Sequence, residues 1–184
     1  MSSPSFNDVD VVLRDGRAVH LRAMHCSDEG ELMQFFERLD PETRYMRFMH
    51  VVRKPHVKRL RRVLAFIPER GTGIVATIPA DDGIDVVGGS SLMIGPDPAS
   101  CEFAVTVTAA YARTGLGRTL MSALIAAAKA RGLLEMEGFV LRANTAMLRL
   151  ADRLGFTTSA DPEDFSVVIC RLRLDAPVDR LAQA

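Results

Sequence analysis

Three residues near the middle of the chain are candidates for chemistry: one carboxylate and two glycines at a helix start. Glu102 begins a short apolar run, and Gly115 and Gly117 follow it at the start of a long helical pattern. The first amide groups of a helix lack internal acceptors, so together with the helix dipole they attract anions. Glycines at this place remove side chains that would keep a phosphate away. The stretch therefore indicates a phosphorylated ligand, although glycine in such a loop also serves as an ordinary turn residue.

Two common phosphate-binding patterns are excluded. The chain has no G-x-x-x-x-G-K-[ST] segment, so it is not a P-loop protein. A dinucleotide fold places G-x-G-x-x-G directly after its strand. Here Leu120 occupies the position of the third glycine, and seven residues separate Val107 from Gly115. Glu135 lies at a suitable distance for the ribose contact, but it falls at the start of the next strand rather than at its end. The pattern does not fit a nicotinamide-dependent enzyme.

The residues around this stretch predict the elements that hold it. A β-rich run covers 103–107, and apolar residues recur at helical spacing from Leu116 to Ala128. Gly132 stands where a left-handed residue ends a helix. Elsewhere we expect strands at 9–13, 18–22, 73–78, 85–94, 133–141, 156–159 and 167–174, and helices that begin near Asp28, Pro41, Pro55 and Asn144.

This order of elements predicts an α/β (or α+β) fold: one mixed sheet of about six or seven strands with helices on both faces. The connection from Val107 through the long helix to Leu133 should join two parallel strands. We expect a flexible N-terminus at 1–8, a single domain at 9–175 and a C-terminal tail at 176–184.

Three local features complete the expected fold. Asp28 should start a helix as a capping box with Glu31, three residues later. Residues 79–83 should form a longer hairpin loop. The one marked charge cluster, RKPHVKRLRR at 53–62, lies on a helix expected over 55–66. A solvated helix face is the favoured interpretation of this cluster, and docking of an acidic partner or of nucleotide phosphates is the alternative.

Composition sets limits on the class of protein. Lys plus Arg and Asp plus Glu number 23 each, so the zero net charge argues against a general nucleic-acid or membrane-surface binder. Cys26, Cys101 and Cys170 are widely spaced and odd in number, which favours reduced thiols over disulfides. No apolar run approaches the ~20 residues of a membrane span. We expect a cytoplasmic protein with no nucleic-acid or membrane partner, and the oligomeric state stays open.

The histidines give no sign of a metal site, and the first tyrosine is interpreted as a packing residue. His20, His25, His50 and His56 lack metal-ligand spacing, so we interpret them as structural and expect no metal. Tyr45 is interpreted as a packed aromatic residue with a solvated hydroxyl, with a place at the acceptor entrance as the alternative.

The order of these features resembles the GNAT acyltransferase superfamily. The resemblance rests on the strand Glu102-Phe103-Ala104-Val105, the helix start Gly115-Leu116-Gly117, Asn144-x-x-Met147 and Leu154-Gly155-Phe156. The earlier segment LRDGRAVHLRAMHCSDEGELMQFFERLDPETRYMRF is similar to the catalytic domain of bacterial Pat-type protein lysine acetyltransferases. The resemblance covers about residues 12–174. It implies acetyl-CoA as cosubstrate, with the diphosphate at the glycine loop and the pantetheine arm between two diverging parallel strands.

The resemblance also implies the residues that bind the cofactor. They are Val105, Val107, Ala112, Arg113, Thr114, Gly115, Leu116, Gly117, Arg118, Thr119 and Asn144. The family pattern Q/R-x-x-G-x-G/A begins at Ala112, where Gln or Arg is usual, so the phosphate should lose one side-chain contact. Arg113 or Arg118 would replace it in part, and Thr119 would add a hydroxyl. Asn144 would contact the pantetheine amide, cap the following helix, or do both.

For catalysis, the resemblance places Glu102 at the position of the general base. A lysine ammonium has a pKa near 10.4 and must lose a proton before its nitrogen can attack a thioester. A carboxylate near the amine can take that proton directly or through a water. A backbone N–H around Val107 would polarise the thioester carbonyl. Ala151 stands where the family often has a tyrosine acid, but CoA can leave as a thiolate because thiol pKa values lie near 8.5.

These residues predict an acetyl-CoA-dependent N-acetyltransferase that works by direct transfer to a primary amine. A protein lysine is the favoured acceptor, because the first half of the chain resembles Pat-type domains. A small-molecule amine is the alternative acceptor. A largely non-catalytic acyl-CoA-binding regulator and an adaptor for acidic partners, using residues 53–62, are the other hypotheses.

Overall fold

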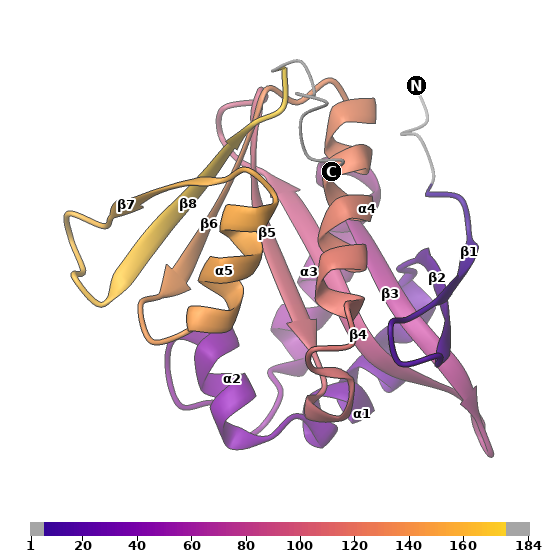
Figure 1. The fold of residues 1–184 in the computed structure, drawn as a ribbon. Coiled ribbons are helices and arrows are strands. Elements are labelled where there is room, and N and C mark those ends of the chain that lie inside the picture. Colours follow the sequence, from indigo (N-terminus) through magenta and orange to yellow (C-terminus); the bar gives the residue numbers. More distant parts are fainter. Residues whose placement is uncertain (1–5, 176–184) are drawn as a thin grey trace.

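A computed structural model describes residues 6–175 of the chain, apart from the side chain of residue 68. One sheet of eight strands runs through it, in the order β1-β2-β3-β4-β5-β6-β8-β7 (Figure 1). Its strands are β1 (Val9–Val12), β2 (Ala18–Ala23), β3 (Gly71–Ala80), β4 (Gly83–Ile94), β5 (Ser100–Val107), β6 (Glu135–Leu141), β7 (Thr157–Ala160) and β8 (Val167–Arg173). Only β5 and β6 pair in parallel, and every other neighbouring pair in the described sheet is antiparallel.

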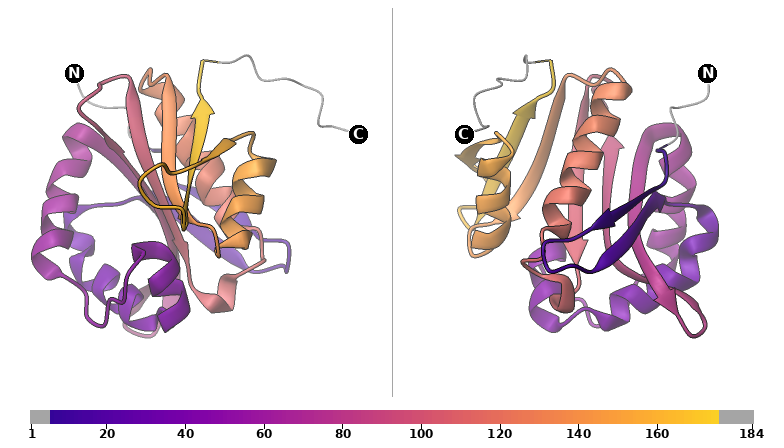
Figure 2. Two further views of the ribbon diagram at one scale, coloured as in Figure 1. Left: turned by 90° about the vertical axis from the view of Figure 1, so that its left-hand side faces the viewer. Right: turned by 45° about the vertical axis from the view of Figure 1, so that its right-hand side comes forward.

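Five α-helices cover the two faces of this sheet. They are α1 (Glu29–Arg38), α2 (Pro41–Phe48), α3 (Val57–Arg70), α4 (Leu116–Ala130) and α5 (Thr145–Arg153). Both views of Figure 2 show α4 and α5 on one side and α1, α2 and α3 on the other. The predicted mixed sheet with helices on both faces is therefore confirmed, as is the parallel connection through the long helix.

Each face of the sheet has its own apolar core. On the α4 side, Leu116, Leu120 and Leu124 are fully buried, because they lie four residues apart on one helix face. On the α1–α3 side, Leu32 and Phe35 of α1 pack with Leu64 and Ile67 of α3, among others. The second core is smaller, and it leaves room for the cavity described below.

The sheet differs from the expected one at its edges. It has eight strands rather than six or seven, because the short outer strands β1 and β7 each pair along their whole length with an inner neighbour. The expected long loop at 79–83 is a two-residue turn, since Ala80 pairs with Gly83 across the β3–β4 hairpin. Residues 1–5 and 176–184 lie outside the described part, so the flexible N-terminus and the C-terminal tail stay predictions.

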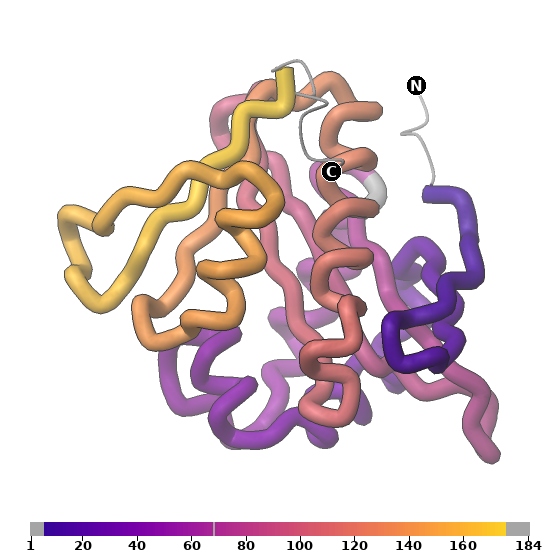
Figure 3. Tube along the Cα trace, viewed as in Figure 1, coloured from indigo at the N-terminus to yellow at the C-terminus, as the bar shows by residue number. Residues whose placement is uncertain are grey.

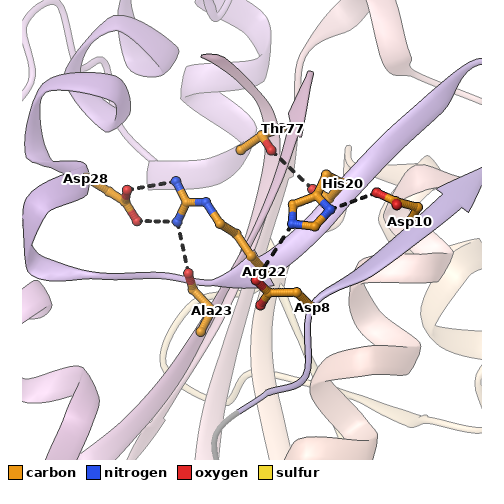
Figure 4. A network of polar contacts seen from close by, with 7 residues as sticks. All are labelled: Asp8, Asp10, His20, Arg22, Ala23, Asp28 and Thr77. Atoms are coloured by element: carbon orange, nitrogen blue, oxygen red, sulfur yellow. Dashed lines mark hydrogen bonds and ion pairs between the residues drawn. The ribbon is translucent and has the colours of Figure 1, made fainter. Parts of the chain in front are cut away.

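Asp28 holds a different partner from the one its sequence suggests. Its carboxylate does not cap α1; it accepts two hydrogen bonds of 2.8 Å from the guanidinium of Arg22 (Figure 4). It also accepts a hydrogen bond from the backbone N–H of His25. Burial raises the pKa of Asp28, but these hydrogen bonds outweigh burial and leave the pKa below its usual value. The pair fixes the start of α1 against β2.

The basic segment at 53–62 also differs from expectation. Its helix, α3, runs from Val57 to Arg70 rather than over 55–66. Arg61 forms hydrogen bonds of 2.7 and 2.8 Å with Glu29, as a solvated helix face would allow. Lys54 and Arg59, however, line a cavity next to the sheet. Every basic side chain at 53–62 is exposed, so the expected solvated face is confirmed, and Lys54 and Arg59 border this cavity as well.

Candidate active site

The parallel strands β5 and β6 form only a short ladder. Their pairing covers Ser100 to Glu102 on β5 and Glu135 to Glu137 on β6, and it stops there. Beyond Glu102 the two strands diverge, as Figure 1 shows. On its other side β5 stays paired with β4 as far as Val107. The edge of β5 that faces β6 therefore has backbone groups without ladder partners between residues 103 and 107.

The ring of Phe103 lies next to β6, just beyond the last paired residues of β5 and β6. A Cβ atom built on Gly138 would lie 2.5 Å from Cζ and 2.8 Å from Cδ1 of Phe103, so the ring lies directly against the glycine backbone. The ring also packs on Phe156, with the two ring centroids 5.2 Å apart. The Phe103 ring therefore packs on the Gly138 backbone at the point where the two strands separate.

The loop after β5 presents amide groups at the start of α4. Gly115 adopts φ +94°, which favours glycine, and is the N-cap residue. Among the described residues, no acceptor lies within hydrogen-bond distance of the backbone N–H of Arg113, Thr114, Gly115, Gly117 or Arg118. The first turn of α4 contains no acidic residue. This loop and helix start therefore provide free donors for an anion.

The side chains of this loop divide into structural and exposed groups. Leu116 is fully buried, so only its backbone can reach a ligand. Thr114 is also buried, and its hydroxyl donates to the carbonyl of Tyr111 at 2.8 Å. Thr119 donates its hydroxyl to the carbonyl of Gly115 at 3.2 Å.

The other loop side chains reach the solvent. Ala112, Arg113 and Arg118 are exposed, with Arg113 in the left-handed region at φ +62°. Among these three residues, only the two arginines carry a positive charge at the helix start. The loop thus combines free amide donors with cations, a combination that suits a diphosphate.

Arg14 also lies at this loop, and no motif in the sequence points to it. The turn between β1 and β2 lies beside the start of α4, where the backbone N–H of Arg14 donates to the carbonyl of Thr114 at 3.1 Å (Figure 3). A Cβ atom on Gly115 would lie 3.5 Å from Cγ, Cδ and Nε of Arg14. The Arg14 side chain is exposed and forms no ion pair within residues 6–175. Only the tertiary contact between the hairpin and the loop places this third cation at the helix start.

Asn144 caps α5 at the far side of the strand gap. Its side-chain oxygen accepts a hydrogen bond of 3.1 Å from the backbone N–H of Met147, as expected for an N-cap. The amide NH₂ of Asn144 has no partner among the described residues and stays available for a ligand. Val105 and Val107 are half-buried on the face that α4 covers, so their backbone groups, rather than their side chains, border the gap.

Glu102 lies on the opposite face of the sheet from α4. It is exposed, and it shares its face of β5 with Ala104 and Thr106 because side chains alternate along a strand. Helix α2 packs against β5 and carries Arg47. Burial lowers the pKa of the Arg47 guanidinium, the negative charge of Glu102 acts to raise it, and the positive charge of Arg59 lowers it further. The carboxylate of Glu102 and the charge of Arg47 are therefore close enough to interact.

A cavity of about 330 Å³ lies on this same face, between the sheet and helices α1, α2 and α3. We call it the helix–sheet cavity. Its floor consists of Gly89, Ser91, Ala104 and Thr106 from β4 and β5. Its walls include Leu32, Phe35, Phe36, Leu39, Leu60 and Val63. Tyr45 lies outside this cavity, at a neighbouring hollow that Pro41 and Val51 also line.

The histidines and cysteines show no metal site in the described part of the chain. His50 and His56, which we interpreted as structural, line the helix–sheet cavity. Burial raises the pKa of the Cys101 thiol to about 12, so it stays protonated. Within residues 6–175 no three His, Cys, Asp or Glu side chains are grouped as a metal site would need. None of the helices in that range is long and apolar enough to cross a bilayer.

A sheet that opens beside a helix start rich in free amides is an arrangement that suits a phosphate-bearing ligand. The chain belongs to the Acetyltransferase (GNAT) family, whose model matches residues 32–156. It is an acetyltransferase and uses acetyl-CoA as its acetyl donor. The residues present fit that ligand, because the glycine-bearing helix start has free amide donors and neighbouring cations.

Three known proteins illustrate the similarity. Acetyltransferase PA5475 of Pseudomonas aeruginosa is 33% identical over 162 residues, which are 88% of this chain and 87% of that protein. The GNAT domain of S. lividans PAT superposes with a TM-score of 0.80 at 25% identity, covering 90% of this chain and 96% of that one. The structure of yncA from Salmonella typhimurium with its cofactor acetyl-CoA has a TM-score of 0.67 at 21% identity, over 90% and 99% of the two chains, and shows the shared fold.

Proposed function

We propose that this enzyme transfers the acetyl group of acetyl-CoA directly to a protein lysine, with Glu102 as general base. The observation that carries the proposal is the position of Glu102 at the last paired residue of β5, where the strands separate. The carboxylate is exposed on the face that bears the helix–sheet cavity, whereas the free amide donors lie at the start of α4. A donor in the strand gap and an acceptor from the cavity side would meet beside Glu102.

The proposed reaction balances with the groups at hand. Glu102 takes a proton from the acceptor ammonium, whose pKa is near 10.4 in free lysine. The neutral nitrogen then forms a bond to the carbonyl carbon of the thioester, and the carbon–sulfur bond breaks. The electron pair leaves with sulfur, and the nitrogen loses its second proton as the carbon–sulfur bond breaks. That proton neutralises the CoA thiolate, whose pKa is near 8.5, and Glu102 returns its own proton to the solvent. A backbone N–H of β5 near Val107 would stabilise the charge that develops on the carbonyl oxygen.

The binding of acetyl-CoA would rest mostly on the backbone. We propose that the diphosphate accepts hydrogen bonds from the free N–H groups between Arg113 and Arg118, since Ala112 offers no polar side chain. The arginines 113 and 118 would contribute charge. Asn144 would use its free amide for the pantetheine arm, while its oxygen caps α5. Support for a lysine acceptor comes from the similarity to the GNAT domain of S. lividans PAT.

A test of the base needs a matched carboxylate as control. CoA release would be measured with purified protein, acetyl-CoA and a panel of lysine peptides and small amines. Glu102→Gln should reduce kcat/KM by about 10²- to 10⁴-fold, the usual contribution of a general base. Glu163→Gln changes an exposed carboxylate on another loop and should leave turnover unchanged. Equal rates for the Glu102→Gln variant and the unchanged enzyme would remove Glu102 from the mechanism.

A small-molecule amine is the second candidate acceptor. The helix–sheet cavity favours it, because about 330 Å³ lies at the lower end of the range for small-ligand pockets. The same panel separates the two acceptor classes by their kcat/KM values. We also propose a cytoplasmic location, supported by the free state of Cys26, Cys101 and Cys170.

A further inference from the structure

The walls of the helix–sheet cavity combine apolar and basic side chains. Besides its apolar residues, the cavity is lined by Arg47, Lys54 and Arg59, together with His50 and His56. No acidic side chain is among the described residues that line it. A cavity of this kind favours a ligand with an apolar body and a negatively charged group.

Arg47 of α2 is one of the cations of this cavity, and it is the one that lies nearest to the proposed reaction centre on the sheet. It is half-buried, and within residues 6–175 its guanidinium forms no hydrogen bond and no ion pair. It lies 5.1 Å from the centroid of the neighbouring Phe48 ring, which gives a cation–π contact only. Burial acts to lower its pKa. Because this half-buried guanidinium has unused hydrogen-bond donors, a bound carboxylate would form charge-assisted hydrogen bonds with it.

Two other arginines of α1 and α2 have acceptors for their terminal nitrogens. Arg44 donates to the carbonyl of Glu37 at 2.8 Å and lies over the Phe36 ring. Arg38 forms an ion pair of 2.6 Å with Asp85. Arg47, in contrast, lines the helix–sheet cavity. There a ligand, rather than the protein, can supply the anion.

The strand geometry relates this cation to the proposed reaction centre. Ala104 and Thr106 form part of the cavity floor, and Glu102 shares their face of β5, two residues before Ala104. Glu102 also acts on the charge of Arg47. A ligand that spans from Arg47 along β5 would therefore bring one end to Glu102.

We infer that the acceptor is an amine that also carries a carboxylate and an apolar body, with the carboxylate bound by Arg47 and the amine next to Glu102. This inference rests on the proposed function and specifies its acceptor. Two kinds of acceptor carry these three groups. One is a free amino acid with an apolar side chain, and the other is a protein lysine beside an acidic and an apolar residue. The small volume of the cavity allows either, because in the second case only the side chains enter it.

Matched acceptor pairs test the inference directly. The free-ligand pair is phenylalanine and phenylalaninamide. Loss of the carboxylate also lowers the pKa of the amine, so kcat/KM is compared per neutral amine. The peptide pair is a capped leucyl-lysyl-glutamate and a capped leucyl-lysyl-glutamine. We expect kcat/KM to be at least about tenfold higher for the acidic member of one pair, through a lower KM, because the carboxylate gains a charge-assisted hydrogen bond from Arg47. The pair that shows the difference identifies the source.

Variants then connect this preference to Arg47. Arg47→Gln should reduce the ratio of kcat/KM between the acidic and neutral acceptors to about one, and Arg47→Lys should restore part of it. Arg62→Gln, an exposed change on the same helix as Arg59 but outside the cavity, should keep the ratio. Equal kcat/KM for the two members of each pair, or a preference that survives Arg47→Gln, would overturn the inference.

Failure of the proposed function gives a different result. In that case no amine accelerates CoA release, with or without a carboxylate. Calorimetry in the presence of CoA still tests the cavity then, because the acidic member of a pair should bind and Arg47→Gln should abolish the binding. Circular dichroism and the melting temperature show whether the Arg47→Gln variant folds. If it does not, the same measurements are made with Arg47→Lys, which should show a partial loss.

Discussion

Replacing Gly138 by alanine should show whether the contact between Phe103 and Gly138 holds the two strands apart. The added Cβ would lie 2.5 Å from Cζ and 2.8 Å from Cδ1 of the Phe103 ring, well inside normal contact distance. The ring cannot move away freely, because it is buried and packs on Phe156. Either β6 shifts or the ring moves toward the gap between β5 and β6.

The expected cost follows from this overlap. Overpacking a well-packed core costs ~1–3 kcal/mol, and a rigid ring on one side and backbone on the other suggest about 2 kcal/mol for Gly138→Ala. For a domain of this size that is a fall of about 4–8 °C in the melting temperature. Urea unfolding measures the loss, with an unchanged m-value as the sign that only the native state is affected. Calorimetry should also show weaker binding of CoA, because the gap changes shape.

A double variant shows whether the Phe103 ring is the cause. Phe103→Leu alone should cost about 1 kcal/mol as a hydrophobic exchange. Combined with Gly138→Ala, it removes the overlap, so the double variant should be more stable than the sum of the two single losses by about 1 kcal/mol. Gly30→Ala is the control, since nothing lies within 4 Å of its added Cβ in helix α1. It should be neutral or stabilising by up to ~1 kcal/mol. Additive losses, or a Gly138→Ala variant as stable as the original, would refute the role of the ring.

Two further predictions concern the cofactor loop and the pair between β2 and α1. Arg14→Gln should raise the Kd for CoA about fivefold, which corresponds to ~1 kcal/mol for an exposed charged contact. Arg70→Gln, at the far end of α3, should leave the Kd unchanged. Equal Kd values for Arg14→Gln and the original protein in calorimetry would exclude Arg14 from the site. Asp28→Asn should cost about 2–3 kcal/mol at neutral pH, because it leaves the guanidinium of Arg22 without its anion. The pKa of Asp28 is lower in the folded protein, so the stability that Asp28 contributes is present above the unfolded value near 3.9 and is lost as pH falls through the folded value. The stability difference between the two proteins should therefore shrink below about pH 4 in urea titrations, and a constant difference would contradict the prediction.

The sequence was most informative where local chemistry decides the structure. Pro41 predicted a helix start, and α2 begins there, with the Asp40 carboxylate accepting the Thr43 N–H at 2.8 Å. Gly132 predicted a left-handed residue after α4 and has φ +73°. In these cases the partner lies within a few residues or the backbone angle itself selects the residue type, so no distant part of the fold can change the outcome.

Predictions failed where a distant partner competes with a local one. Asp28 has the spacing of a helix cap, yet the guanidinium of Arg22 binds its carboxylate, because a charged pair is stronger than a cap. The basic residues at 53–62 are exposed, as a solvated face requires, but the sequence did not show that Lys54 and Arg59 also border a cavity whose other walls come from α1, α2 and the sheet. Periodicity cannot show which side of a helix will face a hollow in a neighbouring layer.

The amino-acid sequence by itself determined the helix start at Gly115, the order of strands around it and the family to which the chain belongs, because glycine positions and apolar spacing act over short distances. Only the tertiary structure decided that Arg14 reaches the cofactor loop and that Arg47 lies unpaired beside the face of Glu102. It also decided that β5 and β6 separate at Phe103. Each of these depends on residues from elements far apart in the chain, and their distance in space is set by packing across the sheet rather than by local sequence.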